Sequence, residues 1–237
     1  MNYFVTGTDT GVGKTLISCA LLHAFAAKGL RVVGMKPVAA GCDEDEHNGD
    51  AKKLRAASNV MASYGQINPY CFLHPVAPHI AARNAGVLID ISRILTSYRE
   101  LTSQADAVIV EGVGGFKVPI NERQDSAELA QQMGLPVILV VGMRLGCLNH
   151  ALLTAGAIDA CGLKLAGWVA NVPDANMLAL RDNIASLEQR LAAPLLGVVE
   201  HQAQPDLQAA AAQINIELLK ENAAGVAQTA PASTNTM

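Results

Sequence analysis

The chain has no apolar run long enough to cross a membrane. The longest run, near residues 135–141, has the length of one buried strand, whereas a membrane-spanning helix needs about 20 apolar residues. The first residues, Met1-Asn2-Tyr3, also lack the basic region and apolar stretch of a secretory signal. These absences argue against a membrane partner, and we expect a cytoplasmic protein.

Positive charge is also scarce. The 237 residues include 17 Lys and Arg against 21 Asp and Glu, which gives a formal net charge of −4. Proteins that bind nucleic acid usually carry an excess of basic residues, so we expect no nucleic acid as the main partner. Hydrophobic residues make up 51% of the chain, which is enough for a large buried core.

Closely spaced cysteines are absent. The five cysteines are odd in number, widely separated and form no Cys-x-x-Cys pair; they are Cys19, Cys42, Cys71, Cys147 and Cys161. A zinc site or a disulfide framework would need closer or paired spacings. We therefore expect free thiols in a reducing compartment.

What the sequence does contain is a glycine-rich loop near its start. Residues 7–15 read Gly-Thr-Asp-Thr-Gly-Val-Gly-Lys-Thr, between an apolar run at 3–5 and an apolar-rich segment at 16–27. Strand, glycine-rich loop and helix in this order are typical of a phosphate-binding loop. Gly11 and Gly13 would let the backbone wrap closely around an anion. The N–H groups of the loop and of the first helical turn would then point at it.

The two residues that end this loop support the same interpretation. Lys14 offers a positive charge to the outer phosphates, and Thr15 offers a hydroxyl to Mg²⁺. Five residues separate Gly7 from Gly13, where the usual pattern has four. Counted from Thr8 the spacing is right, although a threonine then replaces the first glycine. The Lys-Thr pair and the flanking segments favour phosphate binding over a simple turn.

Apolar segments and helical patterns alternate along the rest of the chain. The predicted strands are 2–6, 31–35, 105–111, 135–142, 163–171 and 194–199, and the predicted helices are 14–27, 50–57, 90–103, 126–133, 149–161, 176–191 and 206–220. Residues 58–79 show no regular pattern. We predict an α/β fold of the P-loop NTPase type, with a single doubly wound, mostly parallel sheet flanked by helices. One domain would cover residues 1–222, followed by a disordered tail at 223–237.

Polar residues stand at the carboxyl ends of these strands, where open α/β sheets bind ligands. Glu111 ends an apolar strand and precedes a Gly-Val-Gly-Gly segment. This position favours a role in holding Mg²⁺ over that of a solvated carboxylate. Lys36 follows the second strand and fits a solvated lysine or a phosphate-neutralising one equally well. Asp50 begins a helix, and from its position alone it is best interpreted as an N-cap.

Several of these segments together resemble the dethiobiotin synthase family. They are residues 5–15, 34–38, 68–70, 78–80, 110–115, 136–140, 145–150 and 167–171. The resemblance covers residues 2 to about 200, and the segments occur in the family's order. It implies an ATP- and Mg²⁺-dependent ligase of biotin biosynthesis. This family converts 7,8-diaminononanoate and CO₂ into a cyclic urea through a carbamate and a carbamic–phosphoric anhydride, with release of ADP and phosphate.

The resemblance also implies roles for individual residues. The catalytic lysines would be Lys36 and Lys14. Residues implied to hold the nucleotide are Gly11, Val12, Gly13, Lys14, Thr15, Leu16, Asp50, Glu111, Gly112, Val113, Gly114, Asn171, Glu200, His201 and Gln202. The metal ligands would be Thr15, Asp50 and Glu111. Residues implied to contact substrate are Thr10, Lys36, Ala40, Gly146, Cys147, Leu148 and Asn149. The last four would act across the interface of a homodimer.

An ATPase switch protein of the ParA or MinD type is the alternative, because it shares the fold. Such proteins usually carry an additional lysine early in the phosphate loop, and residues 8–12 contain none. A third possibility is a related amide-forming ligase that acts on a corrinoid. Its usual glutamine-hydrolysing domain has no room in a chain of this length.

Overall fold

The computed structural model describes residues 1–43, 45, 47–204 and 206–219. The predicted tail at 223–237 and the domain boundary at 222 lie outside these residues. The main sheet has six strands in the order β2-β5-β1-β6-β7-β8. They are β1 (Asn2–Gly7), β2 (Val32–Met35), β5 (Ala107–Glu111), β6 (Val137–Gly142), β7 (Leu165–Asn171) and β8 (Leu195–Val199). Every neighbouring pair in this sheet is parallel, which confirms the predicted fold class.

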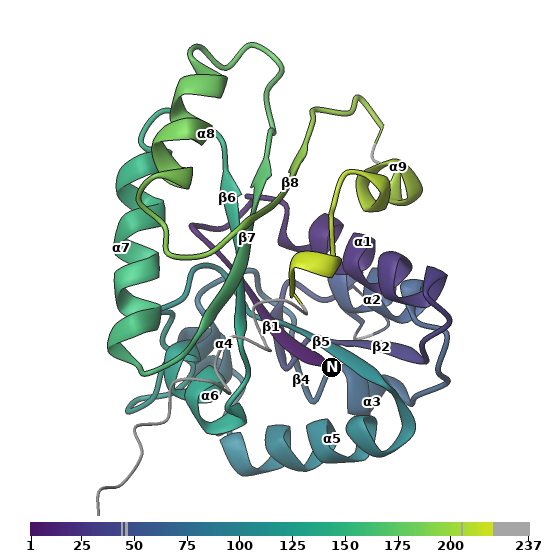
Figure 1. Cartoon of the computed structure of the whole chain (residues 1–237). Coiled ribbons are helices and arrows are strands. Elements are labelled where there is room, and N and C mark those ends of the chain that lie inside the picture. The colour runs from purple at the N-terminus through teal and green to yellow at the C-terminus, as the bar shows by residue number, and fades with distance from the viewer. Residues whose placement is uncertain (44, 46, 205, 220–237) are drawn as a thin grey trace, which may run out of the picture.

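Helices cover both faces of this sheet (Figure 1). One face packs against α1 (Lys14–Ala27), α2 (Gly49–Ala57) and α9 (Leu207–Ala212). The other packs against α5 (Ile91–Gln104), α6 (Ser126–Met133), α7 (Cys147–Ala160) and α8 (Leu180–Glu188). Burial on both sides explains why strands such as β6 are apolar at successive positions rather than at alternate ones. No helix within the described residues has the length and hydropathy needed to span a membrane.

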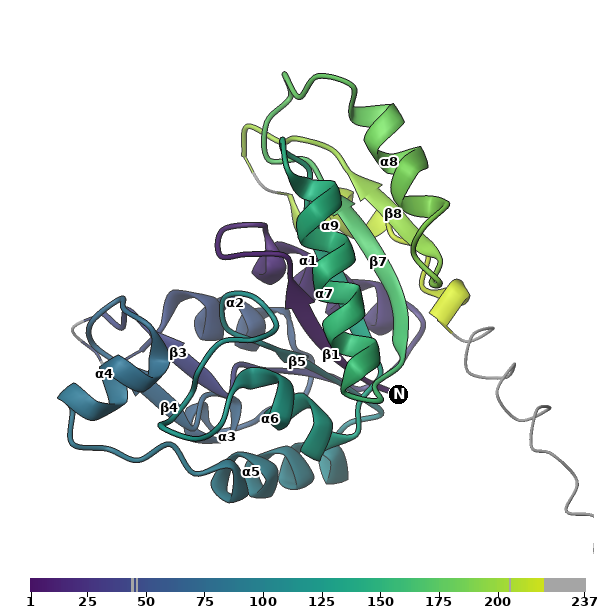
Figure 2. The ribbon, with the colours of Figure 1, turned by 90° about the vertical axis from the view of Figure 1, so that its left-hand side faces the viewer.

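A second, two-stranded sheet lies beside the main one and was not predicted. It pairs β3 (Val38–Ala40) with β4 (Tyr70–Phe72) in parallel, near the short helices α3 (Tyr64–Ile67) and α4 (Pro78–Asn84). Figure 2 shows β3, β4 and α4 together at one side of the molecule. The prediction of an irregular segment at 58–79 was wrong, because strands of three residues are too short to show an alternating pattern.

The same small sheet brings two cysteines together. Cys42 and Cys71 form a disulfide across a sequence separation of 29, with Cα atoms 6.3 Å apart. The expectation of five free thiols was therefore wrong for this pair, because the pairing of β3 with β4 could not be read from cysteine spacing. The other three cysteines are free, and Cys19 and Cys147 are buried. Burial raises the pKa of the Cys19 thiol to about 12, which makes it a poor nucleophile.

Two helices differ from their predictions because of contacts elsewhere in the fold. The helix predicted at 206–220 stops at Ala212, because the backbone N–H of Asn215 donates to the Leu196 carbonyl of β8. The helix predicted at 176–191 is reduced to α8. In contrast, α1 and α6 have the predicted bounds. Their glycine ends, Gly13 and Gly134, were visible in the sequence.

Candidate active site

The loop between β1 and α1 forms a cradle at the carboxyl edge of the sheet. Gly11 and Gly13 have positive φ angles of 74° and 93°, which side chains disfavour. Gly13 is also the N-cap of α1, and a Cβ there would collide with the Asn171 amide. The first turn of α1 therefore opens toward the loop with its unpaired N–H groups, an arrangement that binds anions.

Lys14 brings a buried positive charge to this cradle. Its Nζ donates to the Asp9 carbonyl at 2.8 Å, and the residue is 7% exposed. Burial, with the nearby charge of Lys36, lowers the pKa of Lys14 to about 8. A phosphate bound in the cradle would compensate for both effects, since an opposite charge favours the protonated lysine.

The second cluster of the site joins Lys36, Thr15 and Glu111. The Lys36 Nζ donates to Glu111 Oε1 at 2.6 Å and to the Gly112 carbonyl at 3.0 Å. The Thr15 hydroxyl donates to the same Glu111 oxygen at 2.9 Å. Lys36 and Glu111 are almost fully buried, and Asp50 Oδ2 lies 3.8 Å from the Lys36 Nζ. Lys36, which follows β2, thus meets Thr15 of α1, Glu111 of β5 and Asp50 in the first turn of α2.

This cluster suits a magnesium ion. Glu111 Oε2 is buried and has no hydrogen-bond partner among the described residues, although a buried carboxylate oxygen normally has one. Two carboxylates and a hydroxyl beside a phosphate cradle are the oxygen ligands that Mg²⁺ takes in phosphoryl-transfer sites. The prediction that Asp50 is the N-cap was wrong, because Asn48 Oδ1 accepts from the N–H groups of Asp50 and Ala51. The Asp50 carboxylate instead lines the cavity.

A cavity of about 720 Å³ connects the cradle to this cluster. The structure brings twelve of the predicted residues together in its wall: Thr10, Gly11, Gly13, Lys14, Thr15, Leu16, Lys36, Ala40, Asp50, Glu111, Val113 and Gly114. The wall also contains residues that were not predicted as part of the site, namely Ala39, Asn48, Lys53, residues 75–78 and Val118. The two prolines in 75–78 signalled a turn but not its location. Another cavity of about 530 Å³, beside Tyr70 and Arg93, contains none of the predicted residues.

Three further predicted residues lie directly behind this wall. Asn171 Nδ2 donates to the Val12 carbonyl at 2.9 Å, and the Gly112 carbonyl accepts from Lys36. Val12 itself is buried. Asn171 therefore supports the phosphate loop from the end of β7.

The remaining predicted residues lie outside the cavity. Glu200, His201 and Gln202 follow β8, where the His201 Nδ1 is 2.9 Å from the Pro173 carbonyl. Residues 146–149 lie at the start of α7, and none of them lines the cavity of this chain. Arg144 forms an exposed ion pair with Asp9, which links the segment before α7 to the phosphate loop.

Comparison with known proteins agrees with this geometry. The family model described as "AAA domain" matches residues 1–209. The MinD cell division protein of Aquifex aeolicus aligns with a TM-score of 0.55 at 13% identity, over 97% of this chain and 98% of that one. The septum site-determining protein MinD of Pyrococcus horikoshii, complexed with Mg-ADP, aligns with a TM-score of 0.54 at 15% identity, over 97% and 100%. At these identities the likeness shows the fold alone. The family match over residues 1–209 shows that the chain belongs to the AAA domain family of P-loop proteins.

The sequence relatives are more specific. The ATP-dependent dethiobiotin synthetase BioD of Nitrosospira multiformis is 57% identical over 207 residues, which is 86% of this chain and 90% of the relative. The protein of the same name from Aromatoleum aromaticum is 54% identical over 217 residues, 90% of this chain and 96% of the relative. The chain belongs to the family of ATP-dependent dethiobiotin synthetases. The predicted family is thereby confirmed, and the MinD-type proteins are distant relatives in fold alone.

Proposed function

We propose that this chain uses ATP and Mg²⁺ to close 7,8-diaminononanoate and CO₂ into the cyclic urea dethiobiotin. The observation that carries the proposal is the meeting of two buried lysines, a hydroxyl and two carboxylates in one cavity beside an anion cradle. Phosphoryl transfer needs positioning and positive charge rather than a covalent nucleophile. This set of residues supplies both.

The proposed reaction has three steps. One amine of the substrate takes up CO₂ as a carbamate, and a carbamate oxygen then attacks the γ-phosphorus of ATP as ADP leaves. The second amine attacks the carbonyl carbon of the resulting carbamic–phosphoric anhydride. The carbon–oxygen bond to phosphate breaks, the ring closes, and phosphate is released.

The lysines and the loop position and stabilise the reacting groups. The loop N–H groups and Lys14 hold the phosphates, and Lys36 neutralises charge that develops between the γ-phosphate and the carbamate. Thr15, Asp50 and Glu111 would hold the metal ion. When bound, Mg²⁺ neutralises phosphate charge and orients the triphosphate.

We assign the adenine to the same edge of the sheet, near Asn171 and residues 200–202. The support is topological, because β7 and β8 are parallel to β1 in the same sheet, and Asn171 at the end of β7 donates to the Val12 carbonyl of the phosphate loop. Substrate would enter the cavity beside Thr10 and Ala40. A cytoplasmic location completes the proposal, since ATP is supplied there.

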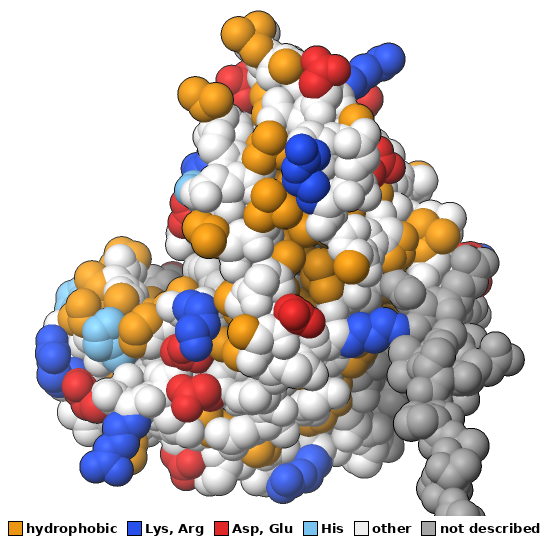
Figure 3. Space-filling model, turned by 60° about the vertical axis from the view of Figure 1, so that its left-hand side comes forward, with side chains coloured by type: hydrophobic (Ala, Val, Ile, Leu, Met, Phe, Trp, Pro, Cys, Tyr) orange, Lys and Arg blue, Asp and Glu red, His pale blue; other side chains and the backbone are white. Residues whose placement is uncertain are grey.

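We further propose a homodimer in which residues 146–149 of one subunit contact the substrate held by the other. The supporting observation is a group of exposed leucines on and beside α7, namely Leu145, Leu152 and Leu153. Figure 3 shows hydrophobic side chains gathered on the upper part of the face formed by α7 and α8. Exposed apolar groups of this kind are typical of protein–protein contacts.

The test is phosphate release with ATP, Mg²⁺, bicarbonate and the diamine, followed by mass analysis of the product. We expect release to require the diamine and to match formation of the cyclic urea. Carbon-13 from labelled bicarbonate should appear in the urea carbonyl. Phosphate release that ignores the diamine contradicts the proposal.

A further inference from the structure

Lys36 occupies the place where the metal ligands converge. Its ammonium lies 2.6 Å from Glu111 Oε1 and 3.8 Å from Asp50 Oδ2. The Thr15 hydroxyl donates to the same Glu111 oxygen. All three residues assigned to Mg²⁺ therefore surround or adjoin one lysine nitrogen.

The burial of this cluster makes the lysine a necessary counter-ion. The Glu111 side chain is fully buried and that of Lys36 nearly so, and water cannot compensate an isolated charge at such a site. Without a cation beside it, Glu111 would be a buried and unpaired carboxylate. In this structure Lys36 fills that role, because Lys14 donates instead to the Asp9 carbonyl.

A divalent ion at the same oxygens would meet this ammonium at close range. Like charges repel strongly where little water separates them. Binding of metal at Glu111 and Asp50 therefore requires that Lys36 withdraw from them. Lys14 and Lys53 also line this cavity, and their ammonium groups offer Lys36 no acceptor, because lysine side chains only donate. Phosphate oxygens would supply charged acceptors for the displaced Lys36.

We propose that Lys36 competes with the metal ion for Glu111 and Asp50. In the nucleotide-free enzyme the ammonium keeps a free divalent cation out of the site. When metal and ATP enter together, the phosphates provide oxygen acceptors for Lys36, and the same displacement delivers its charge to the reacting groups. The inference rests on the metal site of the proposed function, and it makes metal binding dependent on nucleotide.

The test is a titration of the full chain with Mn²⁺ alone, in which the unbound ion is measured by electron paramagnetic resonance. We expect Lys36→Met and Lys36→Gln to bind Mn²⁺ at least about tenfold more tightly than the unaltered chain, a difference of about 1.4 kcal/mol. Lys36→Gln retains donors for Glu111 and Gly112, so it provides the result if Lys36→Met does not fold. Lys36→Arg keeps the charge and should leave the affinity near that of the unaltered chain.

Lys53→Met is the matched control, because Lys53 lines the cavity but is exposed. Among the described residues, the side-chain partners of Glu111 are Lys36 and Thr15, not Lys53. Its removal should change the affinity by less than about threefold, since exposed charges are screened. The gain should also vanish when Glu111→Gln is added to Lys36→Gln. An unchanged affinity in the folded Lys36 variants, an equal gain in Lys53→Met, or a gain that survives Glu111→Gln overturns the inference. Because no ATP or diamine is present, such a result leaves the diamine-dependent activity to be judged separately.

Discussion

Gly13 is the residue on which the geometry of the phosphate cradle depends most. It combines a positive φ with a direct collision between an added Cβ and the Asn171 amide. We expect Gly13→Ala to lower the free energy of unfolding by about 1–3 kcal/mol and to weaken ATP binding. Urea unfolding and an ATP titration measure the two effects.

Gly134→Ala is the control for this residue. Gly134 has a φ of 63° but open space around an added Cβ, so it tests backbone strain without the collision. We expect a smaller loss of stability and unchanged ATP affinity. Equal behaviour of the two variants would contradict a special role for the contact between Gly13 and Asn171.

Several residues of the site could be predicted from the sequence. Lys14, Thr15 and Glu111 could be placed because each adjoins the end of an apolar strand or a glycine-rich loop, and parallel strands bring such ends to one edge. Asp50 could not be assigned from its local pattern, because the preceding Asn48 performs the capping. Asn48 and Asp50 could each cap this helix, and their spacing alone does not show which of the two side chains does so.

Among the elements, we expect the β3–β4 pair to depend on its cross-link. The Cys42–Cys71 disulfide joins residues with a sequence separation of 29, and for a closed loop of about this length chain entropy predicts a stabilisation of about 3–4 kcal/mol. We expect Cys71→Ser, or dithiothreitol added to the unaltered chain, to lower the urea midpoint of unfolding. Cys161→Ser should leave it unchanged.

A midpoint in the unaltered chain that does not respond to dithiothreitol would show that the cross-link contributes nothing. In a reducing compartment the stabilisation would be absent, because disulfides are rarely kept there. The loop that follows Cys42 leads to Asn48 and Asp50. Reduction should therefore also loosen the approach to the metal ligands.

The long elements were predictable for reasons that β3, β4 and α9 do not share. The helices α1 and α6 have clear periodicity and glycine ends, and β6 is a continuous apolar run. In contrast, β3 and β4 have three residues each, and α9 ends where the chain pairs with β8. Contacts between distant segments decide these boundaries, and local sequence does not record them.

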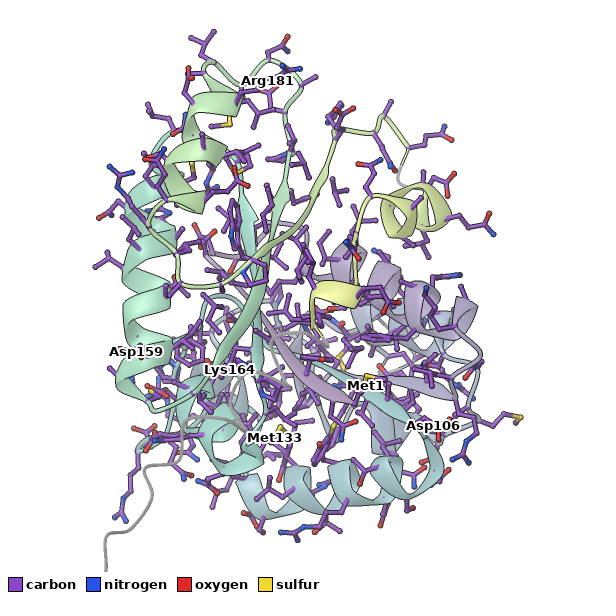
Figure 4. All side chains as sticks on the ribbon, in the orientation of Figure 1. Met1, Asp106, Met133, Asp159, Lys164 and Arg181 are labelled. Atoms are coloured by element: carbon purple, nitrogen blue, oxygen red, sulfur yellow. A yellow bond between two sulfur atoms is a disulfide. The ribbon has the colours of Figure 1, made fainter. Side chains whose placement is uncertain are left out.

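At the scale of the whole molecule, an ion pair and a hydrogen bond to Asp106 join the starts of three strands, at the edge of the sheet opposite the site. Arg31, before β2, donates to both carboxylate oxygens of Asp106, before β5, and the Met1 amino group donates to the Asp106 carbonyl. Figure 4 labels Met1 and Asp106. The hydrogen bonds from Arg31 lower the pKa of Asp106 to about 2, from an ordinary value of 3.8.

Because this pKa is lowered on folding, Asp106 stabilises the fold above its ordinary pKa and loses that contribution as the pH falls from about 4 to about 2. We expect Asp106→Asn to be less stable than the unaltered chain at pH 6, with the difference shrinking through this window. Urea unfolding at a series of pH values measures it. A stability difference between the two proteins that stays constant from pH 6 to pH 2 would contradict the lowered pKa of Asp106. Asp159→Asn, at an exposed position on α7, serves as the control.

The proposed reaction requires that a carbamate oxygen of the substrate attack the γ-phosphorus of ATP within this cavity. The most direct measurement follows oxygen-18 from labelled bicarbonate during the first turnovers with ATP, Mg²⁺ and the diamine. We predict that the released phosphate carries one labelled oxygen, because the carbamate oxygen stays on phosphorus when the ring closes. Cyclic urea formed together with unlabelled phosphate would contradict it.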